Sequence, residues 1–201
     1  MDHARVEFFW DVASPYTYLA ATQLGALVDR TGVRIDWRPF LLGGVFRATG
    51  NNAPATIPAK WAYLRADLVR WAAYYRIPFH VPELFPLRSV LPQRLACAAL
   101  GNGSEPSRLP LALMHAYWVE GRDLSQADEL AKVCTSLGLD APALLVAAEQ
   151  QTAKDLLRAN SDEAVRRGAF GAPALFLGKH LFWGNDRLEL LEACLQGRIS
   201  P

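Results

Sequence analysis

A serine stands at the start of a predicted helix in the segment FFWDVASPYTYLAA, residues 8–21. Ser14 followed by Pro15 has the residue types of a helix N-cap and a first helical position. The free N–H groups and partial positive charge of a helix N-terminus stabilise anions, and they lower the pKa of thiols. Ser14 is therefore either a capping residue with no further role or a group that holds and ionises a ligand thiol. A serine hydrolase is disfavoured, because neither a G-x-S-x-G elbow nor a histidine in local register is present.

Two segments near the C-terminus carry further candidates. Ala172-Pro173 begins the strand-like run in GAFGAPALF. A trans proline opening an edge strand is the simpler interpretation, whereas a cis bond would turn the backbone N–H and C=O of Ala172 toward a ligand. In FWGNDRL, Asn185 and Asp186 stand at the start of the last predicted helix. They are either an N-cap pair or an amide and a carboxylate that recognise a zwitterionic ligand end.

The other polar residues give weaker signals. Asn51 follows Gly50 and has the pattern of a turn. Lys60 precedes a helix whose basic side chains form, by default, a solvated face. No metal site is predicted, because the four histidines have no metal-ligand spacing: His3, His80, His115 and His180.

The elements that must position these residues follow a clear order. The helix after Ser14 should run to about Arg30, and VRIDWRPF then alternates as a half-buried strand. From residue 41 to about residue 168 we find only helical periods and loops. PALFL and HLFW, joined by a two-residue turn, indicate a hairpin, and DRLELLEACLQ indicates a closing helix. The sequence thus predicts an α/β fold in which a helical insertion separates β-α-β from β-β-α and packs on the sheet.

Within the insertion, KWAYLRADLVRWAAYYR is the strongest amphipathic helix, since large apolar residues recur at steps of three and four. The preceding GGVFRATGNNAPATIPAK is predicted to be a loop. IPFHVPELFP, with prolines four residues apart, indicates an extended connector. Further helices are predicted in SVLPQRLACAAL, LPLALMHAYWVE, SQADELAKVCTSLG, APALLVAAEQQ and residues 152–167. Ser125, with Asp128 three residues on, is the expected N-cap of the third of these.

Composition narrows the class of partner. The 201 residues carry 21 basic and 20 acidic side chains, so no field of one sign attracts nucleic acid or anionic lipid. No apolar run approaches the roughly 18 residues of a membrane span, and we expect no secretory leader. Cys97, Cys134 and Cys194 are predicted to be buried free thiols of a cytoplasmic protein. A small-molecule partner follows by elimination.

Together these stretches resemble one family. D-x-x-S-P-Y-x-Y at residues 11–18, PFLLGGVFRATGN, IPAK with DLVRWA, IPFHVP, FGAPALF and FWGNDRLELL occur in the order typical of kappa-class glutathione transferases and 2-hydroxychromene-2-carboxylate isomerases. The resemblance covers nearly the whole chain. It implies a thioredoxin-like fold related to the disulfide oxidoreductase DsbA, with residues 1–41 and 156–201 forming the thioredoxin-like domain and residues 42–155 an inserted α-helical domain.

The resemblance also implies a glutathione site centred on Ser14. The Ser14 hydroxyl would hydrogen-bond the sulfur of glutathione, and Thr17 stands where related oxidoreductases have the second cysteine of C-x-x-C, so no redox dithiol is expected. Ala172 would pair through its backbone with the cysteinyl part of glutathione. The resemblance therefore favours a cis bond before Pro173.

The ends of the ligand would be bound by other residues. By the same resemblance, Asn185 and Asp186 would hold the γ-glutamyl end of glutathione, and Asn51 would contact the tripeptide. Lys60 and Arg88 are candidate anchors for an acidic substrate, by charge and position alone.

The implied activity is a glutathione-dependent isomerisation. Transient thiolate addition would convert 2-hydroxychromene-2-carboxylate, or a related aromatic acid, to trans-o-hydroxybenzylidenepyruvate in the catabolism of aromatic compounds. The loop FRATGNNAP is more similar to the kappa transferases, so a kappa-class glutathione transferase or peroxidase is an alternative. A non-catalytic thioredoxin-like binding module is a third. The family also implies a homodimer.

Overall fold

A four-stranded sheet lies at the centre of the part of the chain that the structure, a computed structural model, describes: residues 4–100 and 106–201. His3 is outside these ranges. The strand order is β2-β1-β3-β4, with bounds β1 Arg5–Trp10, β2 Arg34–Pro39, β3 Ala174–Leu177 and β4 His180–Trp183. β1 pairs parallel with β2 and antiparallel with β3, whose Ala174 is opposite Phe9. The carboxyl end of β1 and the start of β3 therefore lie side by side at the same end of the sheet.

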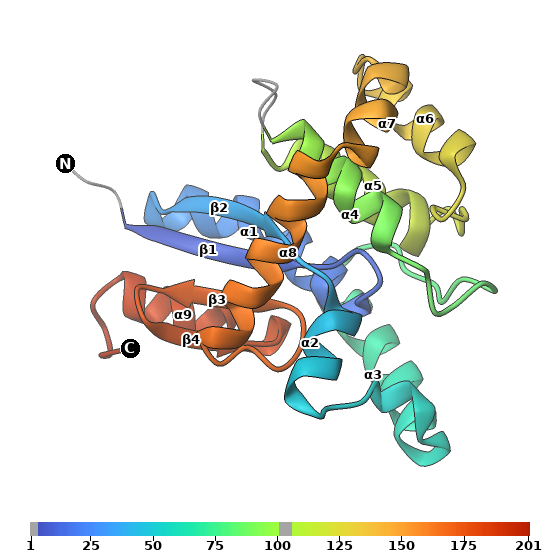
Figure 1. Cartoon of the computed structure of the whole chain (residues 1–201). Helices are drawn as coiled ribbons and strands as arrows, with labels where there is room; N and C mark the ends of the chain where they lie inside the picture. The colour runs from blue at the N-terminus through green and yellow to red at the C-terminus, as the bar shows by residue number, and fades with distance from the viewer. Residues whose placement is uncertain (1–3, 101–105) are drawn as a thin grey trace.

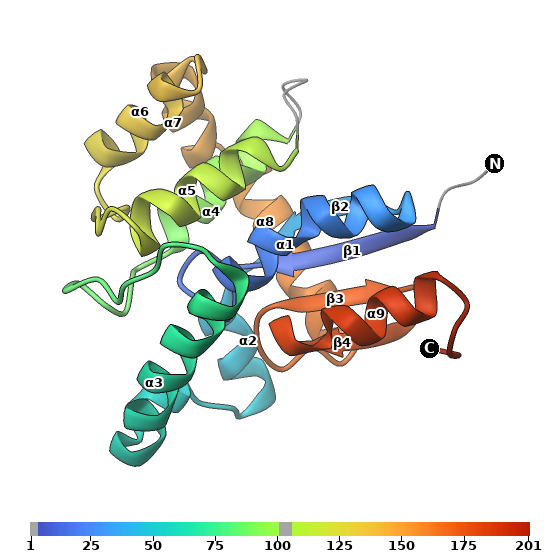
Figure 2. The ribbon, with the colours of Figure 1, turned by 180° about the vertical axis from the view of Figure 1, so that it is seen from behind.

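Helices cover both faces of this sheet. α1 (Pro15–Thr31) and α9 (Leu188–Leu195) lie on one face, and α8 (Gln151–Arg166) crosses the other (Figures 1 and 2). Because strand side chains alternate, Phe8 of β1 joins the core on the α1 face, whereas Phe9 packs with Phe40 and Phe176 on the α8 face. Both faces of β1 are buried, as its apolar sequence predicts.

The remaining helices lie beyond the end of the sheet where β1 finishes (Figure 1). They are α2 Leu42–Thr49, α3 Pro58–Tyr75, α4 Val90–Ala99, α5 Arg108–Trp118, α6 Ala127–Ser136 and α7 Ala141–Glu149, with 3-10 turns η1 Pro54–Thr56 and η2 Asn185–Arg187. One apolar cluster joins Phe8 of the sheet to Leu113 and Leu144 of these helices. The predicted order of elements and the packing of the insertion on the sheet are confirmed. The division after residue 155 stays a prediction, and α8 spans it.

α2 corrects the prediction of a loop after residue 42. Two adjacent glycines make its sequence a poor helix former. The backbone N–H of Leu42, at the first turn, donates to Oδ2 of Asp11 at 2.8 Å, and the C-cap Gly50 has φ of 70°. A carboxylate from a segment about 30 residues away thus satisfies a helix N-terminus that the local sequence does not cap.

The N-terminus of α6 also differs from the expectation. Gln126, not Ser125, is the N-cap residue, and no side chain caps this helix. The Ser125 hydroxyl donates to Oδ1 of Asp123 at 2.6 Å, and the Ser125 backbone N–H donates to the same oxygen at 3.0 Å. The predicted N-cap at Ser125 is wrong because the Asp123 carboxylate binds Ser125 in the preceding turn.

Candidate functional site

Ser14 is the N-cap of α1 and lies where β1 and β3 meet. Its Oγ accepts from the backbone N–H of Thr17 at 3.2 Å and donates to the carbonyl oxygen of Ala172 at 3.2 Å. The side chain is nearly buried, with 4% of its residue surface exposed. The capping interpretation is confirmed, and the second hydrogen bond shows that the hydroxyl also faces a segment 158 residues away. Whether it activates a thiol stays a prediction.

The bond between Ala172 and Pro173 is cis. The family resemblance favoured this isomer, whereas the local pattern favoured trans. The backbone N–H of Gly184 donates to the carbonyl oxygen of Pro173 at 3.1 Å. The polar backbone groups of residues 172–173 therefore link Ser14 at the end of β1 to the segment that follows β4. A second cis bond, between Phe85 and Pro86, lies in the connector predicted to be extended.

Asn51 follows α2 and joins the same region through Phe170. Its Nδ2 donates to the carbonyl oxygen of Phe170 at 2.9 Å, and its Oδ1 accepts from the backbone N–H of Asn52 at 2.8 Å. Phe170 packs against Trp183 with ring centroids 4.7 Å apart, and a Cβ added to Gly171 would lie 2.6 Å from the Trp183 indole nitrogen. Gly171 thus leaves room for an exposed aromatic pair beside the cis bond.

Asn185 and Asp186 lie in the 3-10 turn η2 rather than at the N-cap of α9. Gly184 is the N-cap residue of η2 and Arg187 that of α9, and no side chain caps either turn, so the capping interpretation is wrong. Asn185 is 2% exposed and donates from Nδ2 to the Tyr75 hydroxyl at 3.3 Å. That hydroxyl donates in turn to the Asn185 carbonyl oxygen at 3.3 Å. Asn185 is therefore fixed by α3. The exposed Asp186 forms an ion pair with its neighbour Arg187 at 3.3 Å.

α3 approaches the start of α1 through a second pair that the sequence analysis missed. The Tyr16 hydroxyl donates to Oδ2 of Asp67 at 2.8 Å. Burial raises the pKa of Tyr16 well above its ordinary value, and the Asp67 hydrogen bond and the negative charge of Asp186 raise it further. Tyr16 is thus a neutral donor at physiological pH. The Asp186 carboxylate lies near enough to Tyr16 to affect its pKa.

Lys60 and Arg88 are exposed, and neither makes an ion pair or a hydrogen bond within the described part of the chain. The segments that carry them lie close together, because Trp61 stacks on Phe85 with ring centroids 5.0 Å apart and an interplanar angle of 4°. The structure does not bring either cation into contact with Ser14, so their role as substrate anchors stays a prediction.

Thr17 occupies the third helical position of α1, and its fully buried hydroxyl has no hydrogen-bond partner among the residues that the structure describes. Such a group is costly to bury. We expect Thr17→Val, which keeps the shape and removes the hydroxyl, to raise the free energy of unfolding by about 1 kcal/mol. Urea unfolding of the two proteins at equal concentration measures this difference. A variant that is less stable than the parent would mean that the hydroxyl has a partner, such as a buried water.

The cysteines are remote from Ser14 in sequence and differ in burial. Cys97 and Cys134 are buried, as predicted, but Cys194 is only half-buried because it lies in the last helix at the edge of the core. Burial raises the pKa of the Cys97 thiol to about 12 and also raises that of Cys134. Within residues 4–100 and 106–201, no group of three or more histidine, cysteine or acidic side chains is arranged to hold a metal ion. No helix in the same ranges is long and apolar enough to cross a bilayer.

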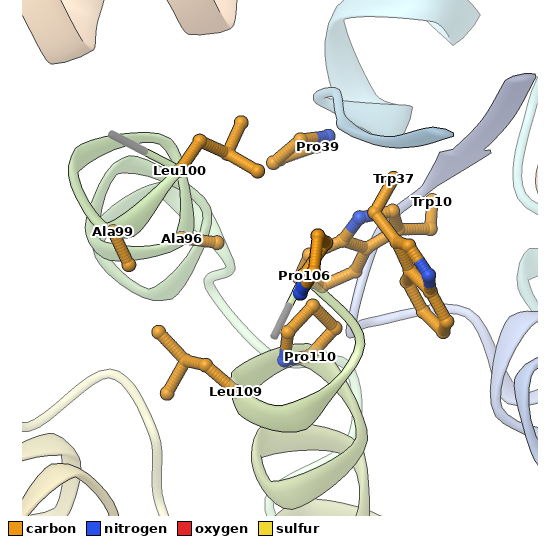
Figure 3. Close-up of a pocket in the computed structure, with 9 residues that line it drawn as sticks. All are labelled: Trp10, Trp37, Pro39, Ala96, Ala99, Leu100, Pro106, Leu109 and Pro110. Carbon is orange, nitrogen blue, oxygen red and sulfur yellow. The ribbon is translucent and has the colours of Figure 1, made fainter. Parts of the chain in front are cut away.

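A small cavity of about 20 Å³ lies apart from these residues, between the sheet and the helices α4 and α5 (Figure 3). It has room for about one water molecule. Apolar side chains dominate its wall, including Trp10, whose buried indole N–H has no partner within the described residues. None of the predicted site residues lines it. The cavity is therefore a packing feature apart from the predicted site.

Asp11 belongs to the motif at residues 11–18 but was not predicted to be a site residue. The structure buries it completely. Gln93 of α4 is equally buried and binds the same loop: its Nε2 donates to the Trp10 carbonyl oxygen at 2.7 Å, and its Oε1 accepts from the Val12 N–H at 3.4 Å. Two features of the sequence could have indicated these residues. Asp11 is a charged residue directly after a buried strand, and Gln93 is an amide within an apolar helix.

The chain is similar to known proteins over nearly its whole length. The family described as DSBA-like thioredoxin domain matches residues 5–196. A 2-hydroxychromene-2-carboxylate isomerase from Sphingobium xenophagum is 35% identical, covering 94% of this chain and 97% of its own. Glutathione S-transferase kappa 2 from Caenorhabditis elegans is 32% identical, covering 91% and 88%. A solved structure of a 2-hydroxychromene-2-carboxylate isomerase superposes with a TM-score of 0.88 at 31% identity, covering 96% and 95%.

These matches confirm the thioredoxin-like fold with its helical insertion, over nearly the full length of the relatives. The relatives are named as isomerases and as glutathione transferases, and their identities to this chain differ by only a few per cent. The chain therefore belongs to the DsbA-like thioredoxin family, in the group that contains the 2-hydroxychromene-2-carboxylate isomerases and the kappa-class glutathione transferases.

Proposed function

We propose that this protein is a glutathione-dependent isomerase that converts 2-hydroxychromene-2-carboxylate, or a related aromatic acid, to trans-o-hydroxybenzylidenepyruvate. The observation that carries the proposal is the position of the Ser14 hydroxyl. It lies at the N-terminus of the 17-residue helix α1 and donates to the Ala172 carbonyl oxygen beside a cis proline. A hydroxyl and a helix N-terminus together favour a thiolate over a thiol.

The hydroxyl and the backbone N–H groups at the start of α1 suit the thiol of a ligand better than a cysteine of the protein itself. Neither Cys97 nor Cys134 can supply a thiolate at neutral pH, because burial raises both of their pKa values. No cysteine occupies the first turn of α1, where Ser14 and Thr17 stand. Glutathione, when bound, would supply a thiol that adds transiently to the conjugated, ring-opened acid and leaves unchanged after the carbon–carbon bond has rotated.

Each part of the site would hold a different part of glutathione. The Ser14 hydroxyl would turn from the Ala172 carbonyl toward the sulfur, which frees that carbonyl to accept from the cysteinyl N–H. The Asp186 carboxylate would attract the ammonium group of the γ-glutamyl end, with Asn185 held beside it by Tyr75. Asn51, tied to Phe170, would contact the tripeptide on the α2 side.

The acidic substrate would be bound between the connector and α3. Lys60 and Arg88 are cations without a partner in the described residues. Trp61 and Phe85, which are close to them in the sequence, stack on each other. A carboxylate with an aromatic ring fits such a combination of charge and flat apolar surface. We further propose, from the family alone, that the protein is a homodimer, and, from its free cysteines, that it is cytoplasmic.

A kappa-class glutathione transferase or peroxidase is the second candidate, in which an electrophile consumes glutathione. The similarity to the Caenorhabditis elegans kappa transferase, at 32% identity, favours it almost as strongly as the isomerases favour the first. A non-catalytic module would bind no glutathione and would be indifferent to Ser14→Ala.

The test begins with a titration of the protein with reduced glutathione at neutral pH, followed by thiolate absorbance in the ultraviolet. Saturable thiolate formation is expected, and its absence would refute a glutathione enzyme. The chromene acid is then added with substoichiometric glutathione. Complete conversion with all glutathione recovered supports the isomerase, whereas conversion of an electrophile with stoichiometric loss of glutathione would identify the transferase.

A further inference from the structure

Asp11 is a fully buried carboxylate that no cation neutralises within the described residues. Its Oδ1 accepts from the backbone N–H of Ala13 at 2.9 Å. Its Oδ2 accepts from the backbone N–H of Leu42 at 2.8 Å and from the Ser89 hydroxyl at 3.0 Å. Burial raises the pKa of Asp11, and the three donors oppose that shift by favouring the charged form. Both oxygens act as acceptors, which a carboxylate can provide and an amide cannot.

The three donors belong to three different segments of the proposed site. Ala13 precedes Ser14, whose own N–H donates to the Asp11 carbonyl oxygen at 3.0 Å. Leu42 begins α2, and the other end of this short helix leads into Asn51. Ser89 directly follows Arg88. One side chain thus contacts the segments that carry the thiol-activating residue, a tripeptide contact and a candidate substrate anchor.

Other buried groups hold the loop after β1, but they reach different elements. Gln93 fixes Val12 from α4, and the Trp118 indole N–H donates to the Val12 carbonyl oxygen at 2.8 Å from α5. Gln93 reaches the chain before α2 only at the carbonyl of Phe40, at 3.1 Å. Among these groups, Asp11 alone satisfies the N-terminus of α2 itself. Ser161 of α8 accepts from the N–H of Leu41, the N-cap residue of α2, at 3.0 Å, but within the described residues it makes no hydrogen bond to the loop after β1. Asp11 thus joins the loop that carries Ser14 directly to the start of the helix that leads to Asn51.

We propose that Asp11 is a positioning residue of the glutathione site, whose carboxylate sets the placement of Ser14 relative to Asn51 without touching the ligand. This inference rests on the proposed function. An amide at position 11 would leave at least one backbone N–H, of Ala13 or of Leu42, facing an NH₂ group. The loop and the start of α2 would then separate.

The test compares Asp11→Asn with Asp140→Asn, which makes the same change at the N-cap of α7, where Asp140 accepts from the Ala143 N–H at 3.0 Å. Two readouts are used: ¹H–¹⁵N amide spectra of the free protein, and the pKa of the bound glutathione thiol from ultraviolet titration. In Asp11→Asn we expect the Ser14 and Asn51 amide signals to move together, the thiol pKa to rise, and glutathione binding to weaken about tenfold. Asp140→Asn should change neither.

The sign of the thiol pKa change separates placement from charge. Loss of a nearby negative charge would by itself lower the thiol pKa, so a fall would overturn the proposal, as would unchanged amide signals at Ser14 and Asn51. If Asp11→Asn does not fold, Ser89→Ala decides, because it keeps the carboxylate and removes one donor. A smaller rise of the same sign supports the proposal, and no change overturns it. If the parent protein binds no glutathione, the proposed function fails. The amide spectra alone then decide whether Asp11 sets the placement of Ser14 relative to Asn51.

Discussion

Replacing Ser14 with alanine is expected to lower turnover by roughly 10²- to 10³-fold, the loss measured when one donor to a developing anion is removed. The hydroxyl is a group at the site that can donate to a ligand sulfur while the helix N-terminus lies behind it. Without it the thiol pKa rises, so the thiolate fraction at neutral pH falls. The pH–rate profile should therefore shift to higher pH, and the defect should shrink in alkaline buffer, where the thiolate forms without help.

Ser14 is also a helix cap, so the variant will lose about 1 kcal/mol of stability for that reason alone. Asp140→Ala is a matched control, because Asp140 caps α7 through the Ala143 N–H and is not a residue of the proposed site. It should lower the melting temperature to a similar extent and leave kcat and the thiol pKa unchanged. Equal rates for Ser14→Ala and the parent at neutral pH, with glutathione saturating, would remove Ser14 from the mechanism.

The parts of the site that local residue types determine could be predicted from the sequence. Ser14-Pro15 after an apolar strand indicates a helix start, and the cap is observed. The hairpin after Pro173 was indicated by two short apolar runs joined by a two-residue turn. The cis isomer was not, because about one X-Pro bond in twenty is cis and nothing in the neighbouring residues indicates it. Only the resemblance of the whole pattern favoured it.

The parts that depend on contacts between distant segments could not be read in this way. α2 contains two adjacent glycines, so a local reading gives a loop, but Asp11 and Ser161 from distant segments accept from the N–H groups at its start. Asn185 looked like a cap because it precedes a helix, but Tyr75 of α3 holds its side chain. In both cases a polar group satisfied by a remote partner overrides the local preference.

Gly184→Ala is expected to weaken glutathione binding by about tenfold or more, as for the loss of a charged contact. Gly184 has φ of 105° and ψ of 157°, a conformation that is costly for any residue with a side chain. An added Cβ would also lie 2.5 Å from Oδ1 of Asp186. The Asp186 carboxylate must therefore move, and in the proposed complex it moves away from the γ-glutamyl end of glutathione. Isothermal titration with glutathione measures the loss, and kcat at saturating glutathione should change little because Ser14 is on another segment.

Gly178→Ala is the matched control at the opposite end of the same hairpin. Gly178 also has a positive φ, of 59°, but an added Cβ would meet nothing within 4 Å. Both variants carry a backbone cost, of about 1 to 2 kcal/mol for the left-handed conformation of Gly178 and about 1 to 3 kcal/mol for Gly184, yet only Gly184→Ala displaces Asp186. If the two variants bind glutathione equally well, Asp186 does not hold the ligand, and the γ-glutamyl end must be bound elsewhere. If Gly184→Ala alone binds weakly, then Asp186→Asn should reproduce its affinity, because the two changes remove the same contact.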